Sequence, residues 1–145
     1  TYNAPNLKST LKNKNINKIF HYARADLLFI KKYLGIKVEN IDCTKIMSKI
    51  ARSYSDKHGL KDLSKEFTGN DISKSLQSSD FGGDLTDKQL QYCAKDVIYL
   101  HKICSSLNNI LKREKRDLLY KNTIQFVHTR VDLDLASYTT DIWSH

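Results

Sequence analysis

The sequence predicts an α/β fold with short strands and a majority of helices. Two short β candidates, Lys18–Tyr22 and Val38–Asp42, flank a predicted helix over Asp26–Leu34, and several more helices follow. A strand, a helix and a second strand in this order are typical of α/β proteins. The chain of 145 residues is long enough to bury a substantial core, and we expect a single domain over residues 1–145.

The first half of the chain carries clear signals for the ends of its helices. A short helix over Ala4–Lys14 precedes the first strand, and the helix that follows this strand stops at Gly35. Thr44 is expected to cap the next helix. Another helix should begin after Gly59 and end at Gly69.

A loop and a long helix dominate the middle of the chain. Residues 70–84 are rich in Ser, Asp and Gly, and a connection of this length is often functional. Thr86 and Gln89 form a capping-box pattern at the start of the helix. Apolar or small residues then recur at helical spacing, which suits packing on a core. They are Leu90, Ala94, Val97, Cys104, Leu107 and Leu111.

The C-terminal part begins with a charged segment, Lys112–Asp117, which we interpret as a solvated turn of helix. One more helix is expected over Leu118–Phe126. We interpret residues 129–145 as a tail that docks onto the domain or onto a neighbouring subunit, because so much apolar surface needs cover. The apolar residues of this tail are Leu133, Leu135, Tyr138, Ile142 and Trp143.

Composition narrows the choice of partners and compartment. The net charge of +8 suits a polyanion such as nucleic acid, or an anionic membrane, although basic chains are also common in lysine-rich proteomes. No apolar run approaches about 18 residues, so no transmembrane helix is expected, and no signal peptide is visible. Cys43, Cys93 and Cys104 lack metal-site spacing. We therefore expect free thiols and a cytoplasmic location.

Three residues form the candidate catalytic group. Tyr92 and Asp96 are four residues apart, so they share one face of the long helix. Asp96 lies in a largely apolar row, where a buried carboxylate needs a partner or a metal. The alternative is an exposed Asp96, or one paired with a lysine. Asp26 follows the first strand, a place where α/β sheets put active sites. The alternative for Asp26 is an N-cap carboxylate.

Convergence of the two carboxylates would give a site for hard cations. Carboxylate oxygens suit magnesium, which keeps several waters and bridges to phosphate oxygens. A pair of metal ions can clamp the attacking and leaving oxygens of a phosphodiester. A tyrosine one turn from a ligand is well placed to position the attacking water.

Five blocks of the sequence, in a fixed order, carry a family resemblance. They are Ile19–Leu28, Asp42–Lys45, His58–Leu63, Gln77–Phe81 and Leu90–His101. Together they resemble the ribonuclease D group of DEDD 3′–5′ exonucleases, tyrosine subtype. Within that group they are most similar to the compact NrnC-type enzymes that degrade very short RNAs. The similarity spans nearly the whole chain.

The resemblance implies an RNase H-like 3′–5′ exonuclease fold, helix-rich and without its N-terminal strands. It implies that Asp96 is a metal ligand and that Asp26 holds the metal pair directly or through water. Tyr92 would orient the nucleophilic water. The cofactor would be Mg²⁺ or Mn²⁺, and the reaction would remove nucleoside monophosphates from the 3′ end of short RNA. NrnC-like enzymes form ring-shaped homo-oligomers, which would give the apolar tail a surface to cover.

One motif of the family is missing from the chain. The first exonuclease motif, Asp-x-Glu, precedes all these blocks, and residues 1–25 contain no Asp or Glu. Without these carboxylates the site loses much of the charge that holds divalent cations. We therefore expect weak or no cleavage by this chain alone, whether it is a shortened chain, the product of a broken gene or half of a split enzyme.

Three further residues are candidates for substrate binding. His21 lies in the first predicted strand and could approach substrate, although a histidine in a strand is more often a satisfied core residue. Arg24 and Lys61 could contact phosphate, or could be ordinary solvated charges. Such contacts would make binding salt-dependent without sequence preference.

Two other functions fit the same sequence. The chain could be a degenerate nuclease fold that only binds nucleic acid or assembles with itself. It could also be a small helical binding protein whose basic charge is incidental. The last alternative predicts that Asp26 and Asp96 lie far apart.

Overall fold

The computed structural model describes residues 2–72, 82–138, 140 and 142–144, and the side chain of Asp96 lies outside this description. The block at Gln77–Phe81 is therefore also outside the described residues. The elements, in chain order, are α1 (Pro5–Lys12), β1 (Lys18–Phe20), α2 (Ala23–Leu34), β2 (Ile41–Cys43), α3 (Thr44–Ala51), α4 (Leu60–Thr68), α5 (Asp87–Ile98), α6 (Leu100–Arg113) and α7 (Asp117–Leu135).

The two described strands form a small parallel sheet. β1 pairs with β2 in a register that places Ile19 opposite Asp42. Parallel neighbours need a crossover, and α2 provides it. α2 ends at Gly35, whose φ of 66° is the left-handed conformation that glycine adopts at little cost. The expected strand, helix, strand order is confirmed.

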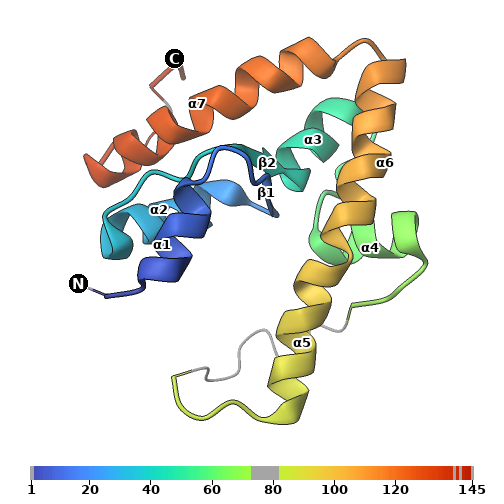
Figure 1. The fold of residues 1–145 in the computed structure, drawn as a ribbon. Coiled ribbons are helices and arrows are strands. Elements are labelled where there is room, and N and C mark those ends of the chain that lie inside the picture. The colour runs from blue at the N-terminus through green and yellow to red at the C-terminus, as the bar shows by residue number, and fades with distance from the viewer. Residues whose placement is uncertain (1, 73–81, 139, 141, 145) are drawn as a thin grey trace.

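Two apolar clusters form the core. The first lies between α3, α4 and α6 and contains Leu63, Ile103 and Leu107. The second lies between the β1–α2–β2 unit and α7 and contains Leu27 and Val127. Ile46 and Ile124 contact both clusters, so the two clusters are continuous. Figure 1 shows α7 lying across the βαβ unit and α6 running beside α3.

The predicted long helix is interrupted. It divides at Tyr99 into α5 and α6, and the predicted capping box at Thr86 and Gln89 is confirmed at the start of α5. α5 extends away from the rest of the molecule in Figure 1. Leu90 and Val97 of the predicted core stripe are consequently 50% and 57% exposed. The stripe packs on the core only in α6, where Leu107 and Leu111 are fully buried.

Several other predicted boundaries were wrong. β2 begins at Ile41 rather than Val38. Cys43, rather than the predicted Thr44, is the N-cap residue of α3. Thr44 lies in the first turn of α3, and its hydroxyl donates to the carbonyl oxygen of Phe20. The charged segment after α6 contains a turn with Lys115 at positive φ, and the last helix continues to Leu135 instead of ending at Phe126. The beginning of the predicted tail is therefore helical.

The described residues contain no helix with the length and apolar character needed to span a bilayer.

Candidate functional site

A cleft of about 580 Å³ lies at the carboxyl end of β1. Ligand sites in α/β proteins are commonly found at this end of the strands. One wall comes from β1 and α2, and the other from α4 and the junction of α5 with α6. Its lining residues are Ile19, Phe20, His21, Asp26, Phe29, Ile30, Leu60, Val97 and Leu100. The walls are largely apolar, with His21 and Asp26 as the polar groups.

Asp26 supplies the carboxylate of this cleft. It lies in the first turn of α2, where the N-cap residue is Tyr22 in a left-handed conformation, so the interpretation of Asp26 as N-cap was wrong. A carboxylate in the first turn still interacts favourably with the helix dipole. The side chain reaches solvent, yet partial burial against the cleft raises the pKa of Asp26 above its usual value. A nearby cation would reverse this shift.

α5 brings the second predicted acid toward the same region. Val97, the residue after Asp96, lines the cleft together with Asp26. Tyr92 lies about one turn earlier in α5 and is partly buried. The roles of Asp96 and Tyr92 remain predictions.

His21 lines the cleft in a neutral form. Its Nδ1 lies 2.9 Å from the hydroxyl of Thr44, and that hydroxyl donates to the carbonyl oxygen of Phe20 at 3.2 Å. The hydroxyl proton is thus committed to Phe20, so Nδ1–H is the donor to Thr44 and Nε2 is the acceptor nitrogen. Burial, assisted by the charge of Lys45, lowers the pKa of His21 to about 4. At neutral pH the ring therefore offers an acceptor rather than a positive charge.

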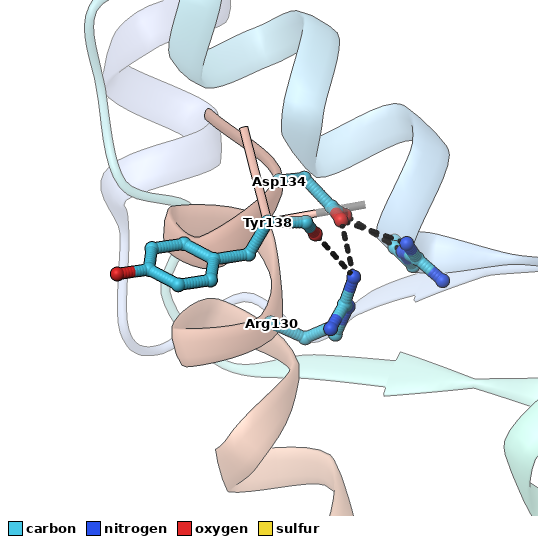
Figure 2. Close-up of polar contacts among 4 residues, drawn as sticks. Arg130, Asp134 and Tyr138 are labelled. Atoms are coloured by element: carbon cyan, nitrogen blue, oxygen red, sulfur yellow. Dashed lines mark hydrogen bonds and ion pairs between the residues drawn. The ribbon is translucent and has the colours of Figure 1, made fainter. Parts of the chain in front are cut away.

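Arg24 is turned toward α7 rather than toward the cleft. Its guanidinium donates twice to the carboxylate of Asp134, at 2.7 Å each. Arg130 donates to the same carboxylate at 2.8 Å and to the carbonyl oxygen of Tyr138 at 3.0 Å, as Figure 2 shows. The hydrogen bonds and charges of the two arginines lower the pKa of Asp134. A phosphate contact by Arg24 would have to compete with this ion pair.

Lys61 lies on α4, outside the residues that line the cleft. Its ammonium group is 3.4 Å from the carboxylate of Asp71, and both side chains are largely exposed. A pair of this kind contributes little to stability. Lys61 therefore remains available for phosphate contact, and its predicted role stays a prediction.

The described part of the cleft carries one carboxylate, that of Asp26. Across the described residues, no group of three or more His, Cys, Asp or Glu side chains is arranged to hold a metal ion. The oxygen donor of Asp26 is of the type that Mg²⁺ prefers, and Mg²⁺ often binds through one or two carboxylates plus substrate phosphates. The single described carboxylate of the cleft, that of Asp26, therefore suits one such ion better than a pair.

The sequence did not predict that Phe29 and Val97 line the cleft. It also did not predict the hydrogen bond between Tyr120 and Asp42. Phe29 follows Asp26 by three residues, so helical spacing could have placed it in the cleft. Val97 was expected in the core instead. Asp42 accepts hydrogen bonds from the hydroxyl of Tyr120 at 2.6 Å and from the amide of Asn17 at 2.7 Å. No sequence pattern signals that link, because Tyr120 is 78 residues away.

Comparison with known proteins identifies the family. The sequence profile of the 3′–5′ exonuclease domain matches residues 1–112. Ribonuclease D of Granulibacter bethesdensis is 28% identical over 126 residues, which are 86% of this chain and 30% of that protein. The chain therefore spans about a third of this curated relative.

Solved structures agree in fold. NrnC of Brucella melitensis superposes with a TM-score of 0.93 at 41% identity, over 99% of this chain and 70% of that chain. That protein has also been solved bound to pGG and with bound Mg²⁺. RNase D of Escherichia coli shares the fold with a TM-score of 0.79 at 23% identity, over 86% of this chain and 33% of that chain.

The expected RNase H-like exonuclease fold is confirmed by these matches. The profile match covers most of the chain, and the NrnC match covers nearly all of it. The chain therefore belongs to the 3′–5′ exonuclease family and is of the ribonuclease D-like, NrnC type.

Proposed function

We propose that this chain is the portion of a 3′–5′ exoribonuclease that carries the second and third exonuclease motifs, and that its substrate is short RNA. One observation carries the proposal: Asp26 and the neighbour of Asp96 line the same cleft at the end of β1. The similarity to Brucella NrnC, which was solved bound to pGG, supports a short RNA as the substrate. The net charge of +8 favours binding to a polyanion.

The residues divide the chemistry among them. Asp26 and Asp96 would hold Mg²⁺ or Mn²⁺, in keeping with the Mg²⁺-bound form of Brucella NrnC. Such an ion, when bound, neutralises charge on the phosphate and acidifies water. Tyr92 would orient the attacking water, and His21 would accept a hydrogen bond from substrate through Nε2. Beyond the cleft, Arg24 and Lys61 would contact phosphates.

Cleavage by the 145-residue chain alone is expected to be weak, because Asp26 and Asp96 supply fewer anionic ligands than a two-metal site needs. The test is a digest of a short 5′-labelled RNA with Mg²⁺ or Mn²⁺ titrated in. Asp96→Asn should abolish the residual cleavage, whereas Asp56→Asn, in an exposed turn, should leave it unchanged. Cleavage that survives Asp96→Asn would contradict the assignment, and full activity of the unmodified chain would contradict the expected weakness.

A binding module without catalysis is the second candidate. It is favoured by the single carboxylate among the described residues of the cleft. This candidate predicts tight, salt-sensitive binding of short RNA with no product at any metal concentration. The same digest, run beside a binding measurement, separates the two functions.

We also propose a homo-oligomer in a reducing compartment such as the cytoplasm. Ile142 and Trp143 near the C-terminus are 47% and 58% exposed, and such apolar surface favours contact with another subunit. The three cysteines are free thiols, as a reducing compartment requires. Sedimentation that shows a stable monomer at micromolar concentration would count against the oligomer.

A further inference from the structure

A second hollow lies between the start of α2, α3 and α7, separate from the cleft that Asp26 lines. Its volume is about 250 Å³. Its apolar lining includes Ala23, Cys43, Ile46 and Val127, and the aromatic residues Tyr22 and Phe126 line it as well. We call this hollow the α2–α3–α7 pocket. Its volume is below that of a drug-sized site, so its ligand must be small.

Four cationic side chains line this otherwise apolar pocket. They are Arg24, Lys45, Lys49 and Arg130. No carboxylate lines it among the described residues. Asp134 is shared by Arg24 and Arg130 and therefore neutralises only part of their charge. An apolar hollow with excess positive charge is complementary to an organic anion.

The two arginines are held in place. Asp134 receives hydrogen bonds from both guanidinium groups, and the carbonyl oxygen of Tyr138 receives another from Arg130 (Figure 2). Within the described residues, the buried Nε of Arg130 has no hydrogen-bond partner. A buried donor without a partner is costly, and an anion in the pocket is one way to satisfy it.

Tyr22 adds an aromatic surface at an unusual backbone position. Its φ of 69° is rare for a residue other than glycine, and such strain concentrates at functional sites. The ammonium group of Lys45 lies 4.2 Å from the centre of the Tyr22 ring, which fixes the ring beside the pocket. Exposed aromatic rings beside cations are the features by which proteins stack nucleobases and bind phosphates.

We propose that the α2–α3–α7 pocket binds a single 5′-nucleotide, with its phosphate at the cationic side chains and its base against the rings of Tyr22 and Phe126. The choice of a nucleotide among organic anions rests on the proposed function. The nucleotide is either a free nucleoside monophosphate or the terminal nucleotide of a short RNA. Binding of the nucleotide needs no metal ion, unlike the proposed cleavage of RNA in the cleft that Asp26 lines.

The chain contains its own reporter for this pocket. Trp143, the single tryptophan, packs edge-on against Phe126 with ring centres 5.1 Å apart. Adenosine 5′-monophosphate titrated into the full chain in EDTA should change tryptophan emission saturably. Because lysine–phosphate contacts supply much of the affinity, Lys45→Gln with Lys49→Gln should weaken binding by about tenfold. Lys49→Glu, at an exposed position, tests the same charge without disturbing the core.

Matched controls separate this site from general charge and from the cleft. Lys65→Gln with Lys102→Gln removes the same charge at exposed positions outside the pocket, and should leave affinity unchanged. Asp26→Asn should also leave it unchanged, so failure of catalysis does not decide the test. Equal weakening by both lysine pairs, loss of binding in Asp26→Asn, or no binding at all would overturn the proposal.

Two further ligands define the chemistry. Inorganic phosphate should bind about tenfold more weakly than adenosine monophosphate, because it makes no ring contact. Equal affinities would overturn the role of Tyr22 and Phe126. A 5′-phosphorylated dinucleotide identifies the source of the nucleotide. Tighter binding than the monophosphate assigns the pocket to an RNA end, and weaker binding assigns it to the free product.

Discussion

At the scale of single residues, His21 and Tyr120 link the two strands to the helices around them. His21, which follows β1, bonds to Thr44 at the start of α3, and Tyr120 of α7 bonds to Asp42 in β2. Burial contributes to the pKa shifts of both His21 and Tyr120. Each link therefore has a consequence for stability that can be measured.

The pKa of His21 predicts a loss of stability in acid. The unfolded chain binds a proton at His21 as pH falls through about 6.5, whereas the folded chain does so only near pH 4. The free energy of unfolding should therefore fall between these pH values, by up to about 3 kcal/mol. Urea denaturation at pH 7 and pH 4.5 should show a smaller pH dependence in His21→Gln than in the parent. His128, whose pKa is also lowered, is present in both chains and cancels.

The hydroxyl of Tyr120 joins β2 to α7. It donates to Asp42 and accepts from the backbone N–H of Cys43 at 3.1 Å. Tyr120→Phe leaves the N–H of Cys43 without its acceptor and should lower the free energy of unfolding by about 1–3 kcal/mol. Tyr54→Phe, at a position 78% exposed, is the matched control for denaturation. Equal stability of the two variants would show that water replaces the lost contact.

The sequence predicted that Asp26 lies after the first strand, near the start of a helix, but it did not predict the ion pair of Arg24 with Asp134. The turn after a strand and the start of a helix are local features, and both follow from residues 18–35. The ion pair of Arg24 with Asp134 joins residues 110 positions apart. Only the docking of α7 on α2 brings these two groups together, so no local pattern predicts the pair.

At the scale of elements, α5 and α6 illustrate what periodicity can and cannot predict. The apolar spacing continues through both helices, and Tyr99 between them has φ −83° and ψ −11°. This conformation is close to helical, so no glycine or proline is needed and no sequence signal marks the break. The buried half of the stripe was predicted correctly, whereas Leu90 and Val97 in the half on α5 are largely exposed.

The capping box should control the stability of α5 locally. Because α5 packs mainly against α6, its first turn depends on hydrogen bonds from Thr86 and Gln89. Thr86→Ala should destabilise this turn by about 1 kcal/mol. Amide hydrogen exchange should accelerate in residues 87–92 and stay unchanged in α6. Acceleration throughout α6 as well would show that the two helices unfold as one unit.

At the scale of the whole molecule, the two core clusters behave as one because Ile46 and Ile124 belong to both. We expect a single unfolding transition for the helices that contact them. The fold class was predictable because the spacing of apolar residues along the chain indicates both the βαβ order and the helix faces that are buried. The exposure of α5 was not predictable from the sequence, since it depends on which other elements pack against that helix.

A core substitution tests this continuity. Leu107 is fully buried, so Leu107→Ala should lower the free energy of unfolding by about 2–5 kcal/mol. Leu118→Ala, at a position 66% exposed, should change it little. Circular dichroism and tyrosine fluorescence should report the same midpoint in each variant. Different midpoints would show that the clusters unfold separately.

The break at Tyr99 is the point about which a change in the tilt of α5 would turn the helix. With a rise of about 1.5 Å per residue, Tyr92 stands about 10 Å from that point and Asp96 about 5 Å. A swing of about 10° would displace the phenol-bearing position by nearly 2 Å, but the acid-bearing position by less than 1 Å. The proposed role of Tyr92, the alignment of the attacking water, would therefore be far more sensitive to the tilt of α5 than the proposed role of Asp96 in binding the cation.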